Sequence, residues 1–337
     1  MLRKGRWLVN RWPFALLAAL LSFGQGGAGL RADDALIAEA RRERGTVRWY
    51  TALNINGSKP LADAFEKKYP FLKVTINRLS NERIMNRIFS EAKSGAPQFD
   101  VTSFAYLPIL AEKGLLARYQ SPQTKAYLEG FFDPKGHWIS MYSNLIVLGY
   151  NTRQVSPASA PKDWPDLLDP RWNDKLGMDA EVGAWYGAML QYMGKEKGEK
   201  FFNALAQQKI HWRRGHSLLA QLMTAGEFPL ALVYAFNISQ LQRSGAPVQW
   251  VSSAKPIIAT TSGVGISAKT DSPASSKLFM DFALSSEGQK TIMETGRFSA
   301  RKDLQTVSGL TTYAVPDAVV LNLDRYLQEF TQLFRPQ

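Results

Sequence analysis

The sequence predicts an α/β protein of two lobes, each built on an open mixed sheet flanked by helices, with two crossover strands joining them. Strand and helix patterns alternate through residues 46–116, which is typical of a sheet covered by helices on both faces. A second alternating unit spans residues 175–234, and two long β-rich runs, 139–152 and 248–268, flank it. One unit inserted into another through two extended runs indicates lobes that close on a ligand by hinge motion.

The first unit carries small polar residues directly after each expected strand. In an open α/β sheet, ligands bind beyond the carboxyl ends of the strands, so these loops should face one crevice. Turn formation and helix capping are the alternative roles. The strands are expected at 46–50, 72–79 and 98–104, and the helices at 33–44, 59–68, 81–94 and 107–116. The candidate ligand contacts are Tyr50, Thr51, Asn54, Ser80, Asn81 and Ser103.

The second unit contains a stretch, 212–240, that combines a basic loop, a short helix and a buried strand. We expect Ser217 to cap a helix over 218–225, Gly226 to end it, and a strand to follow over 229–234. A helix N-terminus beside a strand end forms a concave polar site that favours anions. The candidate contacts from this unit and the first crossover are Tyr142, Ser143, Glu181, Tyr186, Arg213, Arg214, Tyr234 and Asn237.

For several of these candidates, a purely structural role such as core packing or solvent exposure is the alternative to ligand binding. Tyr186 follows Trp185 at a helix start, where aromatic side chains commonly pack in a core. Arg213 and Arg214 could clamp a carboxylate or phosphate through a planar guanidinium, although exposed arginines are usually just solvated. The segment 260–262 could serve either the second crossover or the ligand.

The domain limits follow from the two crossovers. Residues 33–140 and 262–337 are expected to form lobe 1, and residues 141–261 lobe 2. The final helix carries a single apolar stripe, so packing of the last helices on lobe 2 is the alternative. That stripe consists of Leu323, Tyr326, Leu327, Phe330 and Phe334.

The N-terminal sequence is typical of a targeting segment. A basic region precedes an apolar run of ten residues, 14–23, which is too short to span a bilayer, and small residues follow it. We expect a signal peptide over 1–32 and export to the periplasm. Loss of this segment removes five basic and no acidic residues, which lowers the formal net charge from +12 to +7. The basic residues are dispersed, so no nucleic-acid partner is expected.

The composition and motifs argue against catalysis and against a resident cofactor. The chain has no cysteine, which excludes disulfides, thiolate metal sites and cysteine nucleophiles, and its three histidines leave little material for a histidine metal site. No GxSxG, P-loop, HExxH or GxGxxG motif is present in a suitable context. We therefore expect a binding protein rather than an enzyme.

Ordered segments along the chain resemble bacterial extracellular solute-binding proteins of ABC importers, in particular the ferric-iron-binding subgroup. They include VRWYTALN, PLADAFEKKYPFLKV, FDVTSF, AEKGLLARY, VLGYNT, QLMTAGEFPLALV and GVGISAKTDSPASSKLFMDFALSSEGQ. The resemblance implies a monomer with the type II periplasmic binding fold. It also implies delivery of a solute to a membrane permease and its ATPase. A receptor that docks on a membrane sensor for signalling is the alternative.

The resemblance leaves the solute open. Iron binders of that subgroup use adjacent tyrosines after the strand that here ends in LALV, but Phe236 and Asn237 stand at those positions. Phenylalanine offers no phenolate to ferric iron, which prefers hard oxygen ligands. We therefore expect a small anion such as an organophosphate or carboxylate first, then Fe³⁺ or an iron chelate as transported ligand, then a cationic metabolite. If iron is the ligand, the candidate metal ligands are Tyr50, Tyr186 and Tyr234.

Overall fold

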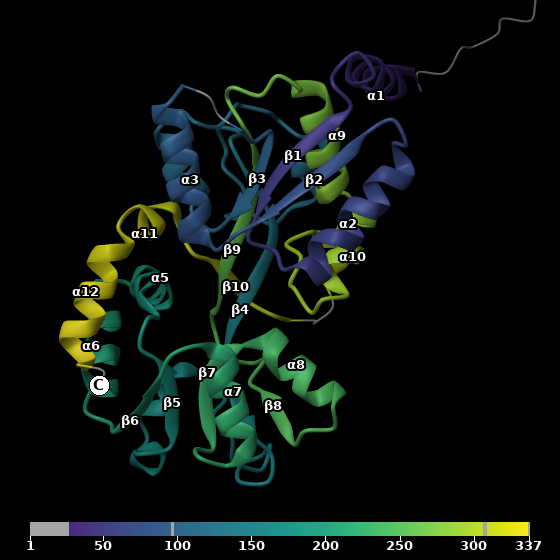
Figure 1. Cartoon of the computed structure of the whole chain (residues 1–337). Coiled ribbons are helices and arrows are strands. Elements are labelled where there is room, and N and C mark those ends of the chain that lie inside the picture. Colours follow the sequence, from purple (N-terminus) through teal and green to yellow (C-terminus); the bar gives the residue numbers. More distant parts are fainter. Residues whose placement is uncertain (1–26, 96–97, 306–308, 336–337) are drawn as a thin grey trace, which may run out of the picture.

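The computed structural model describes residues 27–95, 98–305 and 309–335. Its strands form one hydrogen-bonded sheet in the order β2-β1-β3-β9-β4-β7-β5-β6, with β10 beside β9 and β8 beside β4. The strands lie in an upper and a lower group, connected by the long strands that run between them (Figure 1). Their bounds are β1 Thr46–Thr51, β2 Lys73–Arg78, β3 Val101–Phe104, β4 Ile139–Asn151, β5 Leu176–Asp179, β6 Ile210–Arg213, β7 Leu230–Tyr234, β8 Val248–Trp250, β9 Ile257–Ile266 and β10 Thr312–Ala314.

The helices surround both groups of strands. Most predicted helices are present, and the expected mixed α/β architecture is confirmed. The helix expected from residue 59 starts four residues earlier, at Ile55. The bounds are α1 Gly27–Ala40, α2 Ile55–Lys68, α3 Asn81–Lys93, α4 Leu107–Glu112, α5 Gly183–Met193, α6 Lys195–Leu205, α7 His216–Ala225, α8 Ala235–Arg243, α9 Pro273–Leu284, α10 Ser286–Met293, α11 Asp317–Leu321 and α12 Leu323–Phe334.

Strand β1 of the upper group is packed on both of its faces. Strand β1 pairs in parallel with β2 and β3, and its neighbouring aromatic residues point to opposite sides. Trp49 packs on Phe279 of α9, with ring centroids 5.0 Å apart, whereas Tyr50 packs on Phe99 in the cluster that includes α3 and α4. The period-2 alternation of the sequence thus places α2 and α9 on one face and α3 and α4 on the other.

The two crossover strands pair with each other along most of their length. The antiparallel register runs from Ile139 opposite Val264 to Ile146 opposite Ile258, with an irregularity between Ser140 and Tyr142. Because this pairing is continuous, the two sheets expected from the sequence are joined through β4 and β9 into one ten-stranded sheet.

The lower group is packed on both sides as well. Met223 of α7 and Ile238 of α8 approach β4 at Gly149, where an added Cβ would lie 3.0 Å from the Ile238 side chain. On the other side, Trp185 of α5 packs on Trp164 and on Phe202 of α6, with ring centroids 5.5 and 5.4 Å apart. These contacts fill the core of the lower group.

The last helix packs on the lower group, as the alternative from the sequence proposed. Phe330 of α12 is fully buried, with its ring centroid 5.9 Å from Tyr186 and 5.7 Å from Trp212. The apolar stripe read from the sequence is therefore the packing face of α12. The carboxyl end of the chain lies beside α6, far from α9 and α10 (Figure 1).

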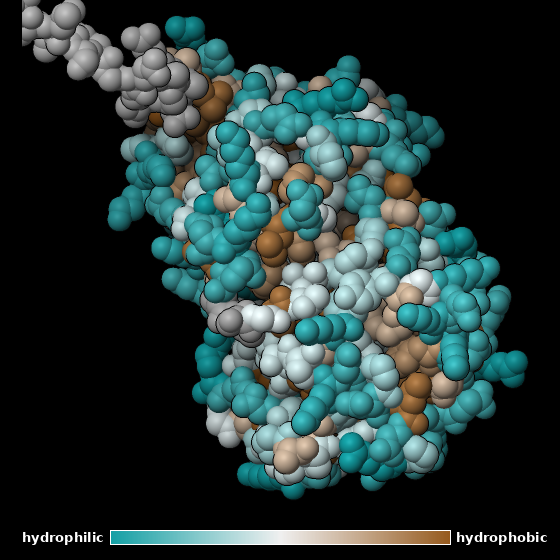
Figure 2. Space-filling model, turned by 180° about the vertical axis from the view of Figure 1, so that it is seen from behind, coloured by the Kyte–Doolittle hydropathy of each residue, from teal (hydrophilic) through white to brown (hydrophobic). Residues whose placement is uncertain are grey.

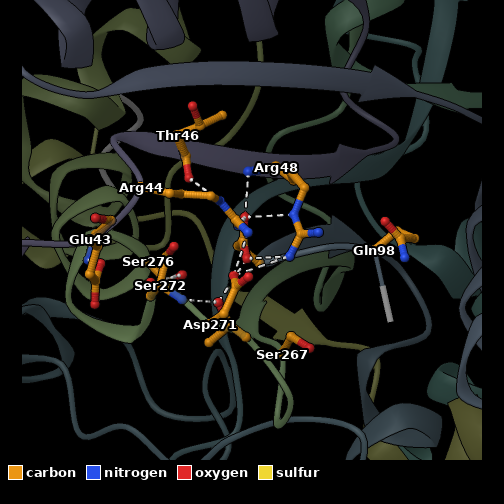
Figure 3. Close-up of polar contacts among 12 residues, drawn as sticks. Glu43, Arg44, Thr46, Arg48, Gln98, Ser267, Asp271, Ser272 and Ser276 are labelled. Atoms are coloured by element: carbon orange, nitrogen blue, oxygen red, sulfur yellow. Dashed lines mark hydrogen bonds and ion pairs between the residues drawn. The ribbon is translucent and has the colours of Figure 1, made fainter. Parts of the chain in front are cut away.

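An ion-pair network ties the beginning of β1 to the segment before α9. The Asp100 side chain is fully buried and accepts hydrogen bonds from the Arg48 backbone N–H at 2.7 Å, from the Arg48 guanidinium and from the Thr270 hydroxyl at 2.8 Å. Arg44 pairs with Asp100 and with the exposed Asp271. Figure 3 shows Arg44 and Arg48 converging on this point. The network lies near the amino ends of β1 and β3, opposite the crevice that the sequence predicts beyond the carboxyl ends of the strands.

Hydrophobic side chains on the back face occur in a few separate areas of an otherwise hydrophilic surface (Figure 2). Within the described ranges, no helix has the length and apolar character needed to cross a membrane. Residues 1–26 of the expected signal peptide lie outside the described residues, and 27–32 belong to α1.

Candidate functional site

A pocket of about 400 Å³ lies where the upper and lower groups meet along the crossover strands; we call it the central pocket. Its walls come from the starts of α3 and α5, the ends of β3 and β7, the middle of β4 and β9, and the C-terminal helices. The volume suits a small organic solute. The lining residues are Asn81, Glu82, Ala105, Tyr106, Asn144, Glu181, Gly183, Ala184, Tyr234, Thr260, Thr261, Ser262, Val315, Val320, Leu323, Asp324 and Leu327.

Two helices begin at this pocket without a side-chain cap. Helix α5 follows Val182 and helix α8 follows Tyr234, and neither N-cap side chain bonds to the first turn. The first backbone N–H groups of a helix have no partner within the helix and carry a partial positive charge. The pocket therefore presents backbone donors to a ligand with an anionic group.

Three carboxylates also line the central pocket. Glu82 accepts a hydrogen bond from the Tyr106 hydroxyl at 3.2 Å. Glu181 lies 3.7 Å from the Arg214 guanidinium, and both side chains are largely exposed. Asp324 stands in the first turn of α12. These oxygens suit the hydroxyl or amino groups of a ligand, and Asn81 and Asn144 add amide groups.

The two tyrosines of the pocket carry neutral phenols. Burial and the nearby Glu82 carboxylate raise the pKa of Tyr106 to about 12. Burial also raises the pKa of Tyr234, whose ring lies 4.0 Å from that of His216. At neutral pH both hydroxyls are therefore hydrogen-bond donors. In the described part of the chain, no three His, Asp or Glu side chains are grouped to hold a metal ion.

Comparison with known sequences identifies the family. The sequence pattern of the bacterial extracellular solute-binding proteins matches residues 101–318 of this chain. The chain belongs to that family. As expected from its sequence, this solute-binding protein is therefore not an enzyme. A relative from Haemophilus influenzae, described as an uncharacterized protein, is 26% identical over 324 residues, which are 92% of this chain and 88% of the relative.

Solved structures support the type II periplasmic binding fold of this solute-binding protein. Iron-bound HitA from Pseudomonas aeruginosa superposes with a TM-score of 0.71 at 22% identity, covering 86% of this chain and 99% of HitA. AfuA from Actinobacillus pleuropneumoniae, with fructose-6-phosphate bound, gives a TM-score of 0.67 at 21% identity, covering 87% and 100%. Ferric iron-binding protein A from Mannheimia haemolytica, in an open conformation, gives 0.74 at 15%, covering 86% and 98%.

Several residues predicted from the sequence line the central pocket of the solute-binding protein. Asn81, Glu181 and Tyr234 are among them, together with the hydroxyl run 260–262. The Asn81 side-chain oxygen already accepts a hydrogen bond from the Ala105 N–H at 3.2 Å. Arg214 does not line the central pocket itself, but its guanidinium lies 3.7 Å from the Glu181 carboxylate, which does. Strand-end position was the signal that located Asn81 and Tyr234.

Three predicted residues of the first unit are turned into the interior instead. The Tyr50 hydroxyl donates to Glu91 at 2.7 Å. The Thr51 and Ser103 hydroxyls lie 2.8 Å apart, and Ser103 also accepts from the Trp49 indole N–H at 2.9 Å. Since these residues end their strands while still inside the sheet, their side chains point to its faces rather than over its edge. We leave them out of the proposed site.

Two predicted residues of the second unit make contacts away from the central pocket. Tyr186 packs between Phe202 and Phe330, with ring centroids 4.7 and 5.9 Å away. Arg213 pairs with Glu227 and donates to the Trp212 carbonyl at 2.8 Å. Neither lines the central pocket. Tyr50 and Tyr186 thus do not accompany Tyr234 in a set of iron ligands.

Two predicted residues stand directly before helices and serve the helix start or solvent rather than the pocket. Asn54 precedes α2 and is exposed, without a side-chain capping bond. The Ser80 hydroxyl accepts a 3.4 Å hydrogen bond from the Arg83 N–H, so it caps α3, as the alternative reading proposed.

The remaining candidates lie at or near the crossover. Tyr142 is buried, and the Ser143 hydroxyl lies 3.2 Å from that of Thr261. The Asn237 amide donates to the Ser217 hydroxyl at 3.1 Å, and its buried Oδ1 has no hydrogen bond within the described residues. The prediction that Ser217 is an N-cap is wrong, since α7 begins at His216 after Gly215. Gly226 ends α7 in the left-handed conformation, as expected.

Sequence reasoning missed four polar residues of the pocket. Tyr106 comes two residues after β3, so the rule that ligands bind at strand ends could have included it. Glu82 lies one residue beyond the predicted Asn81. Asn144 and Asp324 have no local signal, because pairing of the crossover strands and docking of α12 bring them to the pocket.

Proposed function

We propose that this solute-binding protein captures a small organophosphate or carboxylate with several hydroxyl groups and delivers it to the permease and ATPase of an ABC importer. The observation that carries the proposal is the meeting of two uncapped helix N-termini, at Val182 and Tyr234, with a ring of acceptor groups in one pocket. The helix N-termini suit the anionic group. The carboxylates and amides suit hydroxyl groups.

The comparison with AfuA supports this ligand class, since that structure of the same fold holds fructose-6-phosphate. The three carboxylates make a bare inorganic anion less suitable than an anion that also brings hydroxyl donors. Glu82, Glu181 and Asp324 would repel an isolated phosphate that approached them, but each can accept a hydrogen bond from a sugar hydroxyl.

Matched pairs of probes test the proposal. We expect fructose 6-phosphate to raise the melting temperature of the exported protein and fructose to leave it unchanged. A ligand at 100 times its dissociation constant adds about 2.7 kcal/mol to the free energy of unfolding, which a thermal-shift measurement resolves. Stabilisation by neutral sugars alone, or by none of a panel of phosphates and carboxylates, would contradict the proposal.

Ferric iron is the second candidate, because Tyr106 and Tyr234 bring two phenols to a pocket that also holds Glu82. Phenolate and carboxylate oxygens are suitable for Fe³⁺. Against it stand the high pKa of both tyrosines and the Phe236 ring, which stacks on Tyr234 with ring centroids 5.7 Å apart. Addition of ferric citrate, with citrate alone as control, distinguishes the candidates, since tyrosinate coordination to iron produces a visible absorption band.

A tyrosine pair offers a matched test of the pocket. Tyr234→Phe removes a hydroxyl of a residue that lines the central pocket, whereas Tyr186→Phe removes one of a residue that lines a different pocket, beside α6 and α12. We expect the first change to weaken binding of fructose 6-phosphate about 2- to 10-fold, which corresponds to one hydrogen bond. The second should leave the affinity unchanged in isothermal titration calorimetry. Equal effects of both changes would exclude the central pocket as the binding site.

We further propose that residues 33–140 and 262–337 form one lobe and residues 141–261 the other, with α12 docked on the second lobe. Hinge motion at β4 and β9 would close the lobes on the ligand of a monomer. Small-angle scattering should then show a smaller radius of gyration with ligand than without it. An unchanged radius at saturating ligand contradicts closure.

The export route is proposed from the sequence alone. Cleavage after residue 32 should yield a periplasmic protein, which mass spectrometry of the secreted chain would show. Nothing among the described residues favours a signalling partner over a permease.

A further inference from the structure

Arg297 is a partly buried cation at the crossover between the two groups of strands. Its guanidinium carbon lies 3.9 Å from the centroid of the Phe236 ring and 5.5 Å from that of Tyr142. One terminal nitrogen donates to the side-chain oxygen of Asn144. The Arg297 Nε–H is buried and has no hydrogen-bond partner in the described part of the chain. A buried donor without an acceptor destabilises the structure unless something else binds it.

Among the described residues, no carboxylate forms an ion pair with this guanidinium. None of the ion pairs within 4.0 Å among the described residues includes Arg297, and burial lowers its pKa. Arg301, four residues later, is the contrasting case. Its guanidinium pairs with Asp303 at 2.9 Å and donates to the Gln123 side chain at 2.8 Å and to the Leu284 carbonyl at 2.9 Å. Arg301 is thus fully engaged in the fold, whereas Arg297 retains unused donors.

The backbone conformation at Gly296 brings Arg297 close to the start of α8. Gly296 has a φ of +84°, which L side chains rarely adopt, and an added Cβ there would lie 3.3 Å from the Cβ of Phe236. The turn at Gly296 therefore lets the guanidinium lie over the Phe236 ring. Phe236 belongs to the first turn of α8, whose N-terminus is uncapped.

A second, smaller pocket of about 120 Å³ surrounds this arginine; we call it the hinge pocket. Asn144 lines both the hinge pocket and the central pocket, and it accepts the Arg297 hydrogen bond. Tyr234, which lines the central pocket, also lies close enough for the Arg297 charge to oppose the rise of its pKa. The hinge pocket has polar walls at Ser143 and Ser239. It is therefore next to the proposed ligand and open to a compact charged group.

We propose that Arg297 is the residue that selects for an anionic ligand: its guanidinium binds the phosphate or carboxylate group of the solute opposite the N-terminus of α8. A guanidinium presents planar paired donors that match these groups in a bidentate manner, and it is always charged at physiological pH. The stacked Phe236 ring holds the plane of the guanidinium in position. This inference rests on the proposed function and assigns its charge selectivity to one residue.

The test compares Arg297→Gln and Arg297→Lys with a control, Arg153→Gln. Arg153 follows β4, is exposed, lines neither pocket, and contributes the same charge to the protein. We expect Arg297→Gln to weaken binding of fructose 6-phosphate about 10- to 100-fold, since hydrogen bonds to charged groups contribute about 1.5–3 kcal/mol. Arg297→Lys should recover part of the loss. Arg153→Gln should match the wild type, and the melting temperature of unliganded Arg297→Gln should not fall.

A spectroscopic measurement on the unaltered protein keeps the test independent of folding of the variants. In ¹⁵N spectra, the Nε–H resonance of Arg297 should shift when fructose 6-phosphate is added and stay in place with fructose. Two outcomes overturn the role of Arg297 and leave the proposed function standing. In one, Arg297→Gln binds fructose 6-phosphate as tightly as the wild type does. In the other, the wild type binds fructose 6-phosphate without a shift of the Arg297 Nε–H resonance. Failure of the wild type to bind any phosphate or carboxylate of the panel overturns both.

Discussion

Replacing Asp100 by asparagine is expected to lower the free energy of unfolding by about 3–5 kcal/mol, the usual effect of removing one partner of a buried ion pair. The Asp100 side chain is fully buried and is the common acceptor of Arg44, Arg48 and Thr270. Without its charge, Arg44 and Arg48 lose their buried counter-ion. Figure 3 shows the side chains of these two arginines converging. Chemical denaturation at pH 7 measures the change.

Asp271 is the matched control for this prediction. It pairs with the same arginines, but its side chain is 67% exposed. Asp271→Asn should therefore cost less than about 1 kcal/mol, as is usual for surface pairs. Equal losses in the two variants would show that burial of Asp100 does not decide the energetics of the network.

The Asp100 contribution should disappear in acid. Burial favours the neutral acid, but hydrogen bonds from Arg48, Thr270 and Arg44 outweigh it and hold the pKa of Asp100 below its usual value. A depressed folded-state pKa contributes stability above the unfolded-state pKa of about 3.9, and this stability is lost as the pH falls toward the folded-state pKa. The difference between wild type and Asp100→Asn should therefore be constant from pH 6 to 8 and shrink below about pH 4. A difference at pH 3 as large as that at pH 7 contradicts this assignment.

The second large effect is expected from Phe330→Ala, which empties the main contact of α12. The ring is fully buried against Tyr186, Trp212 and Phe334, and truncation of such a residue usually costs about 3–5 kcal/mol. Because α12 also supplies Leu323, Asp324 and Leu327 to the central pocket, loosening the helix should weaken ligand binding as well. Denaturation measures the first effect and calorimetry with fructose 6-phosphate the second.

Phe330→Leu is the matched control, because it removes the aromatic ring but keeps a large apolar side chain at this position. This substitution retains most of the apolar volume, so it should cost less than the alanine variant and leave the pocket intact. Hydrogen exchange over residues 323–334 reports whether α12 opens locally or with the whole protein. If Phe330→Ala changes neither stability nor exchange in α12, the helix does not depend on this contact.

Some of the polar site was accessible to sequence reasoning and some was not. Tyr234 and Asn81 were found because they follow strands, and the carboxyl ends of strands are the usual binding edge of α/β sheets. The same rule placed Thr51 and Ser103 at the ligand, but their hydroxyls bond to each other inside the sheet. Strand ends are uncertain by a residue or two, and a shift of one residue moves a side chain from one face to the other.

Arg297 illustrates what local patterns cannot reveal. In the sequence it is one of 41 basic residues, in a short segment between two elements. Its proposed role rests on the absence of an acidic partner among the described residues and on the approach of Phe236, which stands 61 positions earlier and belongs to another part of the chain. Neither a missing partner nor a long-range contact has a signature in the neighbouring residues.

The sequence by itself determined the order of most strands and helices, though not α8 or β10, as well as the binding-protein class and the absence of cysteine chemistry. Period-2 and period-3.6 patterns are local properties, and they survive whatever the rest of the chain does. The tertiary structure decided which polar groups share a pocket, how β4 and β9 join the sheets, and that α12 closes the pocket wall. These depend on the pairing and packing of residues far apart in the chain, which no local pattern encodes.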